Sequence, residues 1–308
     1  MDTKTLKTMV EKNFEFYKNG KVADYIPALA KVNPKQLGIA LYDLKSRSLL
    51  QAGDATVRFA IESMSKVPVL LLAIEDNGLD AVFSKVNTEP TGFAFNSILN
   101  TEINHRKHPM NPFVNAGAIA TNSLVSGSNS QERFERILDF MREISDDNGI
   151  YLNEDIYHSE SRTGDINRSL AYYMKGNQMI TGDVDDILDS YFKQCSVNVT
   201  AVGMAHLAAV LANEGIMPWN GKRIVSKDSA TAVKSIMTTA GLYDESGEFS
   251  THVGVPAKSG VGGGLMAAVP KKYGIGTFSP ALDSCGNSTA GIKLLQAVVS
   301  DLDLNIFE

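Results

Sequence analysis

A serine followed three positions later by a lysine, Ser63 and Lys66, stands directly before the longest apolar run of this 308-residue chain. Residues at this spacing lie on one face of a helix, so the lysine amine would be held beside the serine hydroxyl. A serine hydroxyl is a poor nucleophile until a neighbouring base takes its proton. At a helix start the serine would also lie at the positive end of the helix dipole, which favours an oxyanion. The pair is a candidate nucleophile and base, although Ser-x-x-Lys also occurs by chance in many helices.

A second motif, Lys258-Ser259-Gly260, lies near the other end of the chain. Ser-x-x-Lys opening a helix and a later Lys-Ser/Thr-Gly on a strand are together typical of serine acyl-transfer enzymes of the β-lactamase type. The motif continues into Val261 and three more glycines, which let the backbone bend close to a reacting atom. A backbone N–H there could pair with that of Ser63 in an oxyanion hole. A flexible hairpin turn is the plainer interpretation, and the two are compatible.

The composition narrows the class of protein. A net charge of −6 argues against nucleic acid or an anionic membrane as the main partner. The apolar run at 67–74 is too short to cross a bilayer. Cys195 and Cys285 stand in no metal or redox spacing, as expected of reduced cysteines in a cytosolic protein. Residues 1–20 have the pattern of an amphipathic surface helix without the apolar core of a secretion signal, so we expect a cytoplasmic protein.

The hydrophobic pattern predicts strands toward both ends of the chain and helices between them. Strands are expected at residues 38–44, 49–53, 252–255, 265–269 and 274–278. Helices are expected at 67–75, 131–144, 183–192, 202–213, 226–238 and 291–302. The predicted class is α/β (α+β), with one antiparallel sheet of early and late strands flanked by the terminal helices, and a helical second lobe. The acyl-transfer site would lie between the lobes, where pockets are common.

Two polar segments could supply binding groups. Asn115 lies in an apolar, small-residue stretch, where a buried amide must be satisfied by backbone or by a ligand; the alternative is a turn asparagine before a helix. Residues 159–167 carry Glu160 and Asn167 and have the pattern of a polar loop. The alternative for that segment is a solvated loop in which Asp165 or Asn167 caps a helix.

The histidines give little support for other chemistry. His105 and His108 have metal-ligand spacing, but the arginine and lysine between them make a poor cation site, so no metal is predicted. The remaining histidines stand in no triad-like context, so a Ser-His-Asp mechanism is not supported: they are His158, His206 and His252.

Taken together, the motifs resemble the serine-dependent glutaminases. The resemblance is carried in order by nine segments, which are more specific in combination than Ser-x-x-Lys alone: residues 24–27, 62–66, 89–92, 95–97, 111–118, Tyr191 with 195–196, 241–243, 256–264 and 283–291. It implies a serine β-lactamase/penicillin-binding-like fold and the hydrolysis of L-glutamine to L-glutamate and ammonia, without a cofactor. It also implies a single domain over 1–308 in two lobes, a sheet lobe (about 1–62 and 250–308) and a helical lobe (about 63–249), and a homo-oligomer, either dimer or tetramer.

The resemblance also implies a role for individual residues. Ser63 would be the nucleophile and Lys66 its general base, and Tyr243 or Lys66 would protonate the leaving ammonia. The implied substrate contacts are Ser63, Asn115, Glu160, Asn167, Tyr191, Tyr243 and the Val261 backbone, with Tyr25 as a further one. One departure is Glu62, where many family members carry glutamine; an extra carboxylate beside the nucleophile could shift the pH profile.

The residue chemistry suits glutamine. Its α-ammonium needs an anion, for which Glu160 is the natural partner, and its carboxylate and amide need directional donors and acceptors. Lys66 must be neutral to act as a base, so its pKa must fall from about 10.4, and burial between the lobes would lower it. Two alternatives remain: a β-lactamase or penicillin-binding-type serine acyl hydrolase, and a non-catalytic module that only binds glutamine or acylates once.

Overall fold

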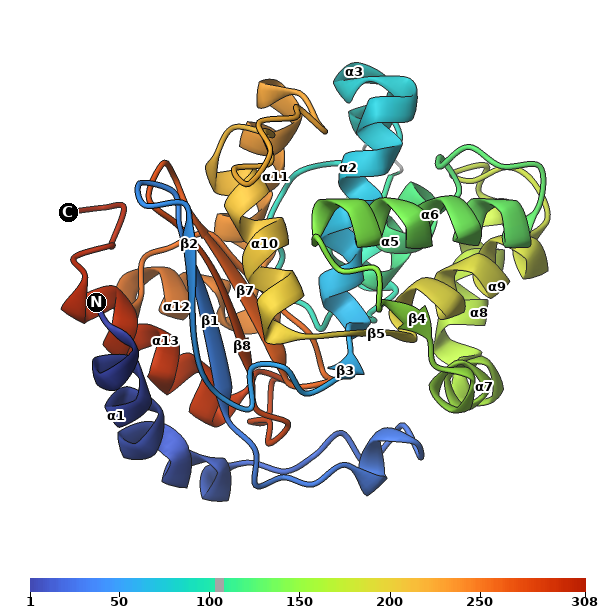
Figure 1. The fold of residues 1–308 in the computed structure, drawn as a ribbon. Helices are drawn as coiled ribbons and strands as arrows, with labels where there is room; N and C mark the ends of the chain where they lie inside the picture. Colours follow the sequence, from blue (N-terminus) through green and yellow to red (C-terminus); the bar gives the residue numbers. More distant parts are fainter. Residues whose placement is uncertain (103–107) are drawn as a thin grey trace.

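A computed structural model describes residues 1–102 and 108–308 (Figure 1). Five strands form one antiparallel sheet in the order β2-β1-β8-β7-β6. The early and late strands therefore join in one sheet, which confirms the prediction. The strands are β1 (Gly38–Asp43), β2 (Ser48–Gly53), β6 (Ala257–Ser259), β7 (Gly264–Val269) and β8 (Tyr273–Phe278).

Helices cover both faces of this sheet and make up much of the remaining molecule (Figure 1). The α-helices are α1 (Thr3–Asn13), α2 (Lys66–Asn77), α3 (Leu79–Phe83), α4 (Leu99–Glu102), α5 (Asn115–Asn122), α6 (Ser130–Ile144), α7 (Glu154–Thr163), α8 (Asp165–Gly176), α9 (Val184–Cys195), α10 (Ala201–Ala212), α11 (Lys227–Ala240), α12 (Ser246–His252) and α13 (Thr289–Asp301). The short 3-10 helices are η1 (Phe14–Asn19), η2 (Leu29–Lys31), η3 (Glu62–Ser65) and η4 (Tyr243–Glu245).

A second, three-stranded sheet was not predicted. Its order is β3-β5-β4, formed by β3 (Phe59–Ala60), β4 (Tyr151–Leu152) and β5 (Val197–Val199). These strands are two or three residues long, which is too short for an alternating pattern to be recognised in the sequence. The sheet matters for the site because β3 leads directly into η3, and the Ile61 N–H donates to the Val197 carbonyl at 2.8 Å.

The side chains of β1 and β7 alternate between two layers of helices, as the period of a strand requires. Ile39 on β1 and Leu265 on β7 belong to a buried cluster with side chains of α1 and α13. Ala40 and Met266, one position further along each strand, belong to the core on the opposite side, with α10. The sheet is therefore buried on both faces, with the two terminal helices on one of them (Figure 1).

Helix α10 packs unusually close to the sheet because two glycines of β8 face it. A Cβ atom at Gly274 would lie 2.2 Å from the carbonyl oxygen of Ala205, and one at Gly276 would lie 2.1 Å from that of Ala201. No side chain fits in either place. The glycines of β8 and the alanines of α10 therefore let the helix pack closely on the sheet. The other side of α10 then supports helix α2.

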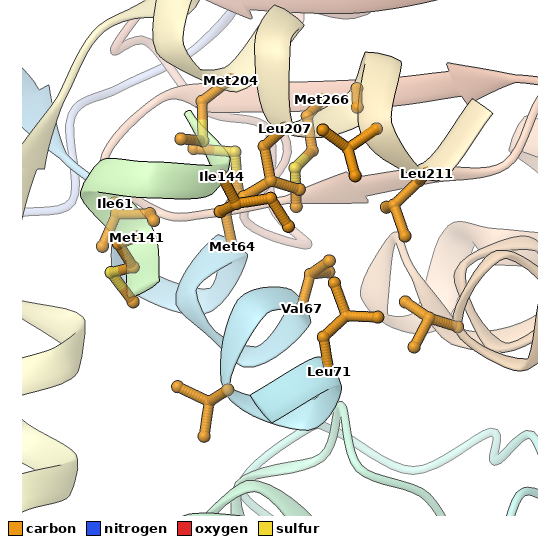
Figure 2. Close-up of a cluster of buried hydrophobic side chains, with 14 of the residues drawn as sticks. Ile61, Met64, Val67, Leu71, Met141, Ile144, Met204, Leu207, Leu211 and Met266 are labelled. Atoms are coloured by element: carbon orange, nitrogen blue, oxygen red, sulfur yellow. The ribbon is translucent and has the colours of Figure 1, made fainter. Parts of the chain in front are cut away.

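Helix α2, which follows Ser63, packs on the other side of α10. Figure 2 shows Met64, Val67 and Leu71 directed toward the side chains of α10, with Met266 of the sheet beside them. Fully burying one such side chain stabilises the fold by about 1.5–3 kcal/mol. The beginning of α2, and with it the nucleophile candidate, is therefore held by the central core. Pro68 lies in the first turn of the helix, where its missing N–H leaves no hydrogen bond unmade.

Two predicted segments differ from the structure. The strand expected at 252–255 is wrong: His252 ends α12, and the chain then turns at Gly254, whose φ is +71°. Val253 and Val255 are both buried, which imitates the alternation of a strand. The positive φ between them breaks the extended backbone, and the Gly254 carbonyl accepts from Ile306 instead of from a neighbouring strand.

The polar loop expected at 159–167 is also wrong, because this segment consists of the end of α7 and the start of α8. The two helices meet at Gly164, where a Cβ would lie 2.4 Å from the Phe192 ring. Only Ile156 and Ser159 are buried on α7, so its apolar stripe is too thin to give a helical period. Neither Asp165 nor Asn167 caps a helix, since the residue before α8 is Gly164, which has no side chain.

The division into two lobes stays a prediction. Helix α10, which it assigns to the helical lobe, packs on the sheet and shares one core with α2 and α6. Among the helices of residues 1–102 and 108–308, none is both long and apolar enough to span a membrane.

Candidate active site

A cavity of about 380 Å³ brings together most of the residues that the sequence predicts for the site. This volume suits a small molecule. The predicted residues that line it are Tyr25, Ser63, Asn115, Glu160, Asn167, Tyr191 and Val261. Lys66 and Tyr243 do not line the cavity but are buried beside the residues that do.

Ser63 lies in η3, where the chain turns from β3 into α2. The residue before it, Glu62, has a φ of +47°, a left-handed conformation that costs a non-glycine residue about 1–2 kcal/mol. The turn between β6 and β7 presses against this segment: a Cβ at Gly262 would lie 2.1 Å from the carbonyl oxygen of Ala60. The glycines after Lys258 therefore form the predicted hairpin turn, and they also let Val261 approach the nucleophile candidate.

Two backbone N–H groups are free for a ligand at this junction. Among the turn and loop hydrogen bonds of residues 1–102 and 108–308, neither the Ser63 nor the Val261 N–H acts as a donor. Both residues line the cavity. Paired N–H groups of this kind stabilise the negative oxygen that develops when a nucleophile attacks a carbonyl.

Lys66 is buried, with 2 % of its surface exposed, and its pKa is lowered to about 8. Burial is the main cause, and the nearby Cys195, Glu62 and Glu160 partly oppose it. Nζ donates to the carbonyl oxygen of Phe113 at 2.9 Å and to Oδ1 of Asn115 at 2.8 Å. A neutral amine has two N–H donors and one lone pair. Both donors are engaged here, which leaves the lone pair for a proton.

Tyr243 is held beside Ser63 by a second buried lysine and by an aromatic ring. Nζ of Lys258 lies 4.6 Å from the centroid of the Tyr243 ring, and the ring of Phe95 packs against it at 4.9 Å. The buried Tyr243 hydroxyl faces those of Ser63 and Ser259, and no described residue meets it in a well-formed hydrogen bond. Burial raises the pKa of Tyr243, so its hydroxyl keeps its proton at neutral pH.

Burial also lowers the pKa of Lys258 well below its ordinary range, and the neighbouring Lys66 lowers it further. The Lys258 amine donates to the carbonyl oxygen of Ser259 at 2.6 Å. The sequence identified Lys258 as part of a motif but assigned it no contact, and the structure places it between the rings of Phe113 and Tyr243.

Two side-chain amides connect Lys66 to the far wall of the cavity. Asn115 begins α5, accepts from Lys66 through Oδ1, and donates through Nδ2 to Oδ1 of Asn167 at 2.9 Å. Asn115 is therefore a buried amide inside the helix and not a turn asparagine before it; the turn is formed by Asn111, whose Oδ1 accepts from the N–H groups of Phe113 and Val114. Asn167 lies in the first turn of α8, and its own amide remains available to a ligand.

Acidic and phenolic groups form the rest of the wall. Glu160 lies on α7, and burial raises its pKa, although Glu62 and Lys66 oppose the shift. Tyr191 is buried on α9 beside Cys195, and burial raises its pKa too. Tyr25 also lines the cavity, and 58 % of its surface is exposed.

Several residues of the cavity were not predicted from the sequence. Glu62 was noted as a departure without a contact, yet it is buried in the wall with 3 % of its surface exposed. Phe95, Asn96 and Cys195 also line the cavity and occurred in segments of the resemblance without an assigned role. Three further lining residues were not predicted, because residues 159–167 were expected to form a loop: they are Thr163, Gly164 and Ile166.

The histidines do not line this cavity within the described part of the chain. His105, considered with His108 as a metal pair, lies outside the described residues. Among residues 1–102 and 108–308, one group of potential metal ligands lies within 4.8 Å, formed by Glu245, Asp283 and Cys285, and none of the three lines the cavity. The absence of a metal from the reaction stays a prediction.

Comparison with known proteins points to one family. A family model described as glutaminase matches residues 20–307. Glutaminase 1 of Clostridium perfringens (strain 13 / Type A) is 64% identical to the chain over 302 residues, which cover 98% of this chain and 98% of that protein.

Solved structures agree with this family. The probable glutaminase ybaS matches with a TM-score of 0.93 at 37% sequence identity, covering 100% of both chains. The Bacillus subtilis glutaminase YbgJ matches with a TM-score of 0.90 at 35% identity, covering 99% of both chains. The YbgJ structure is a covalent complex with 5-oxo-L-norleucine, formed by reaction of that protein with 6-diazo-5-oxo-L-norleucine.

Proposed function

Because the chain belongs to the glutaminase family and hydrolyses L-glutamine to L-glutamate and ammonia, we propose that Ser63 is the nucleophile of this reaction and Lys66 its general base. The mixed α/β fold, an antiparallel sheet flanked by helices, is the β-lactamase-like fold of that family. The main support for this role is that the Lys66 amine donates two hydrogen bonds within the protein. Its two N–H groups are occupied by Phe113 and Asn115, so in the neutral form its lone pair is free for the Ser63 proton.

In the first half-reaction, Lys66 takes the proton of the Ser63 hydroxyl while the oxygen attacks the side-chain carbonyl carbon of glutamine. The carbonyl oxygen becomes negative and accepts hydrogen bonds from the N–H groups of Ser63 and Val261. The carbon–nitrogen bond then breaks. The leaving nitrogen takes a proton from the Lys66 ammonium, directly or through the Tyr243 hydroxyl, and departs as ammonia.

In the second half-reaction, water hydrolyses the glutamyl ester on Ser63. The neutral Lys66 amine takes a proton from the attacking water, the ester bond breaks, and the proton returns to the Ser63 oxygen. Tyr243 suits the relay because burial raises its pKa and its hydroxyl keeps a proton that can be passed on.

The residues that would bind the substrate line the same cavity as Ser63. We assign the α-ammonium to Glu160, since a buried carboxylate satisfies a cation best. The amides of Asn115 and Asn167 and the hydroxyls of Tyr191 and Tyr25, which line the cavity, would contact the α-carboxylate and the side-chain amide. The Tyr243 hydroxyl, buried beside Ser63, would be a further contact. Asn115, Asn167 and Tyr191 come from three different helices, α5, α8 and α9, so their contacts would define one orientation of glutamine.

The nucleophile is tested by covalent labelling. The protein should react once with 6-diazo-5-oxo-L-norleucine, and peptide mass spectrometry should place the adduct on Ser63. Ser63→Ala should remain unlabelled and should not turn over, while calorimetry still detects glutamine binding. Labelling of Cys195, which lines the same cavity, would refute the assignment; Cys195→Ser is the matched control and should still label on Ser63.

We also propose that the enzyme works in the cytoplasm as a homo-oligomer, either dimer or tetramer, without nucleic acid, and that its domain has the two lobes described above. The net charge of −6 supports the absence of a polyanionic partner. Light scattering after size exclusion should give a multiple of the 33.3 kDa chain. A monomer across micromolar concentrations would exclude the oligomer.

A further inference from the structure

Glu62, the residue next to the nucleophile, carries a carboxyl group that the reaction described above does not use. It is buried with 3 % of its surface exposed, although ionised carboxyl groups are rarely buried without a partner. Its backbone is held at a φ of +47° between β3 and α2. The side chain cannot easily leave the cavity wall, because the neighbours Ile61 and Met64 are anchored in the central core.

The carboxyl group of Glu62 meets that of Glu160, which lies on α7 and lines the same cavity. Within the described residues, no N–H or O–H group donates to Oε1 of Glu62. Two carboxylates have only acceptors and cannot form a hydrogen bond with each other. Their contact therefore requires a proton between them, as in other buried carboxyl pairs.

The surroundings decide which group holds that proton. The titratable groups that act on the pair are Lys66, the phenols of Tyr25, Tyr191 and Tyr243, and the Cys195 thiol. Burial raises the pKa of the phenols and the thiol, so they are neutral at neutral pH. The amine of Lys66 is bonded to Phe113 and Asn115. Glu62 is the more deeply buried of the two acids. Burial is the largest cause that raises the pKa of both, but their contact raises the pKa of Glu62 further and lowers that of Glu160.

We propose that Glu62 is a positioning residue that keeps its proton at neutral pH and donates it in a hydrogen bond to Glu160, so that the Glu160 carboxylate is oriented toward the α-ammonium of the substrate. The inference rests on the proposed role of Glu160. It gives Glu62 a part in the recognition of α-amino acids as a class. No proton is exchanged when the substrate binds, and the pair carries one negative charge before and after.

The first test compares Glu62→Gln with Glu62→Leu. The glutamine side chain introduced at position 62 has the shape of glutamic acid and can donate the same hydrogen bond, but it does not titrate. The leucine side chain fills the space and donates no hydrogen bond. Glu62→Gln should keep the KM for glutamine within about threefold of wild type, and Glu62→Leu should raise it roughly tenfold or more. Glu62→Leu should also lose discrimination against an analogue without the α-amino group. If both variants raise KM alike, Glu62 acts as a charge and the inference fails.

The second test measures how the titration of Glu62 changes stability with pH, and it remains valid if Glu62→Leu fails to fold. A carboxyl group whose pKa is raised in the folded protein releases its proton on unfolding, so the stability it contributes is lost as pH rises from the unfolded value toward the folded one. The Tm advantage of Glu62→Gln over wild type should therefore grow between about pH 5 and about pH 8. Glu11→Gln, an exposed carboxyl of α1 on the other side of the sheet, is the control and should show no such trend. A constant Tm difference would overturn the inference.

The third measurement separates this inference from the proposed function. If Glu160→Gln binds glutamine as wild type does, the assignment of Glu160 to the α-ammonium is wrong. If Glu160→Gln weakens binding but Glu62→Leu does not, only the role of Glu62 fails. Calorimetry in buffers of different ionisation enthalpy should detect no proton release when glutamine binds to Ser63→Ala. Release of one proton to the buffer would mean that the carboxyl pair loses its shared proton when the α-ammonium binds, and would overturn the inference.

Discussion

The amine of Lys66 on α2 and the side-chain amide of Asn115 on α5 meet at 2.8 Å inside the core of the molecule. Oδ1 of Asn115 accepts a hydrogen bond from one of the two N–H groups of the neutral amine, and the carbonyl oxygen of Phe113 accepts from the other. Lys66, as the base that we propose, acts only when it is unprotonated, so its pKa should set the pH range of the enzyme.

We therefore expect kcat/KM for glutamine to rise with pH through an apparent pKa near 8, the lowered value of Lys66. Asn115→Asp puts a carboxylate beside the amine, which favours the ammonium form and should move this rise upward by about one to three pH units. Asn167→Asp, one amide further from Lys66, should move it less. A profile with no rise between about pH 6 and about pH 9 would exclude Lys66 as the base.

Ser63 and Lys66 should behave as one catalytic unit. Ser63→Ala and Lys66→Ala should each lower kcat by roughly a thousandfold or more, and the double variant should be hardly slower than either single one. The measurement is a double-mutant cycle on kcat with purified, folded variants. Losses that add in the double variant would mean that another group is the base, and Tyr243 would be the next candidate.

Glu160→Gln removes the charge that we assign to the α-ammonium, so it should raise KM for glutamine roughly ten- to a hundredfold. The informative substrate is an analogue without the α-amino group. Wild type should have a much lower kcat/KM for this analogue than for glutamine. Glu160→Gln should reduce the ratio between the two kcat/KM values. Unchanged discrimination in this variant would show that Glu160 does not contact the α-ammonium.

Gly262→Ala should disturb the proposed oxyanion site through packing alone. The new Cβ would lie 2.1 Å from the Ala60 carbonyl oxygen, so the turn that carries Val261 must move away from Ser63. We expect a lower Tm and a fall in kcat of about tenfold to a thousandfold with a smaller change in KM. Gly247→Ala is the matched control: no atom lies within 4 Å of its Cβ position on α12, and the change should leave kcat unaltered. Equal effects of the two substitutions would argue against the oxyanion site.

The elements that the sequence predicted correctly have clear periods. The strands at β1, β2, β7 and β8 and the longer helices were predicted within a few residues, because their apolar residues recur at the spacing of a strand or helix. Helix α7 was missed because it buries too few apolar residues to give a period. Helix α8 buries Leu170, Ala171 and Met174 at helical spacing, so its period was present in the sequence and was not recognised. The strand at 252–255 was predicted in error because Val253 and Val255 are buried on either side of Gly254, whose backbone is left-handed.

The sequence by itself determined which chemical groups are available: a serine and a lysine on one helical face, a glycine-rich turn, and the acid and amides that suit an amino acid. Local spacing is sufficient for this, because residues three positions apart on a helix are neighbours whatever the rest of the chain does. The tertiary structure decided the state of those groups. The pKa of Lys66, the contact of Glu62 with Glu160 and the approach of Gly262 to Ala60 depend on burial and on partners from distant segments. Desolvation and contact between separate elements arise only when those elements pack together.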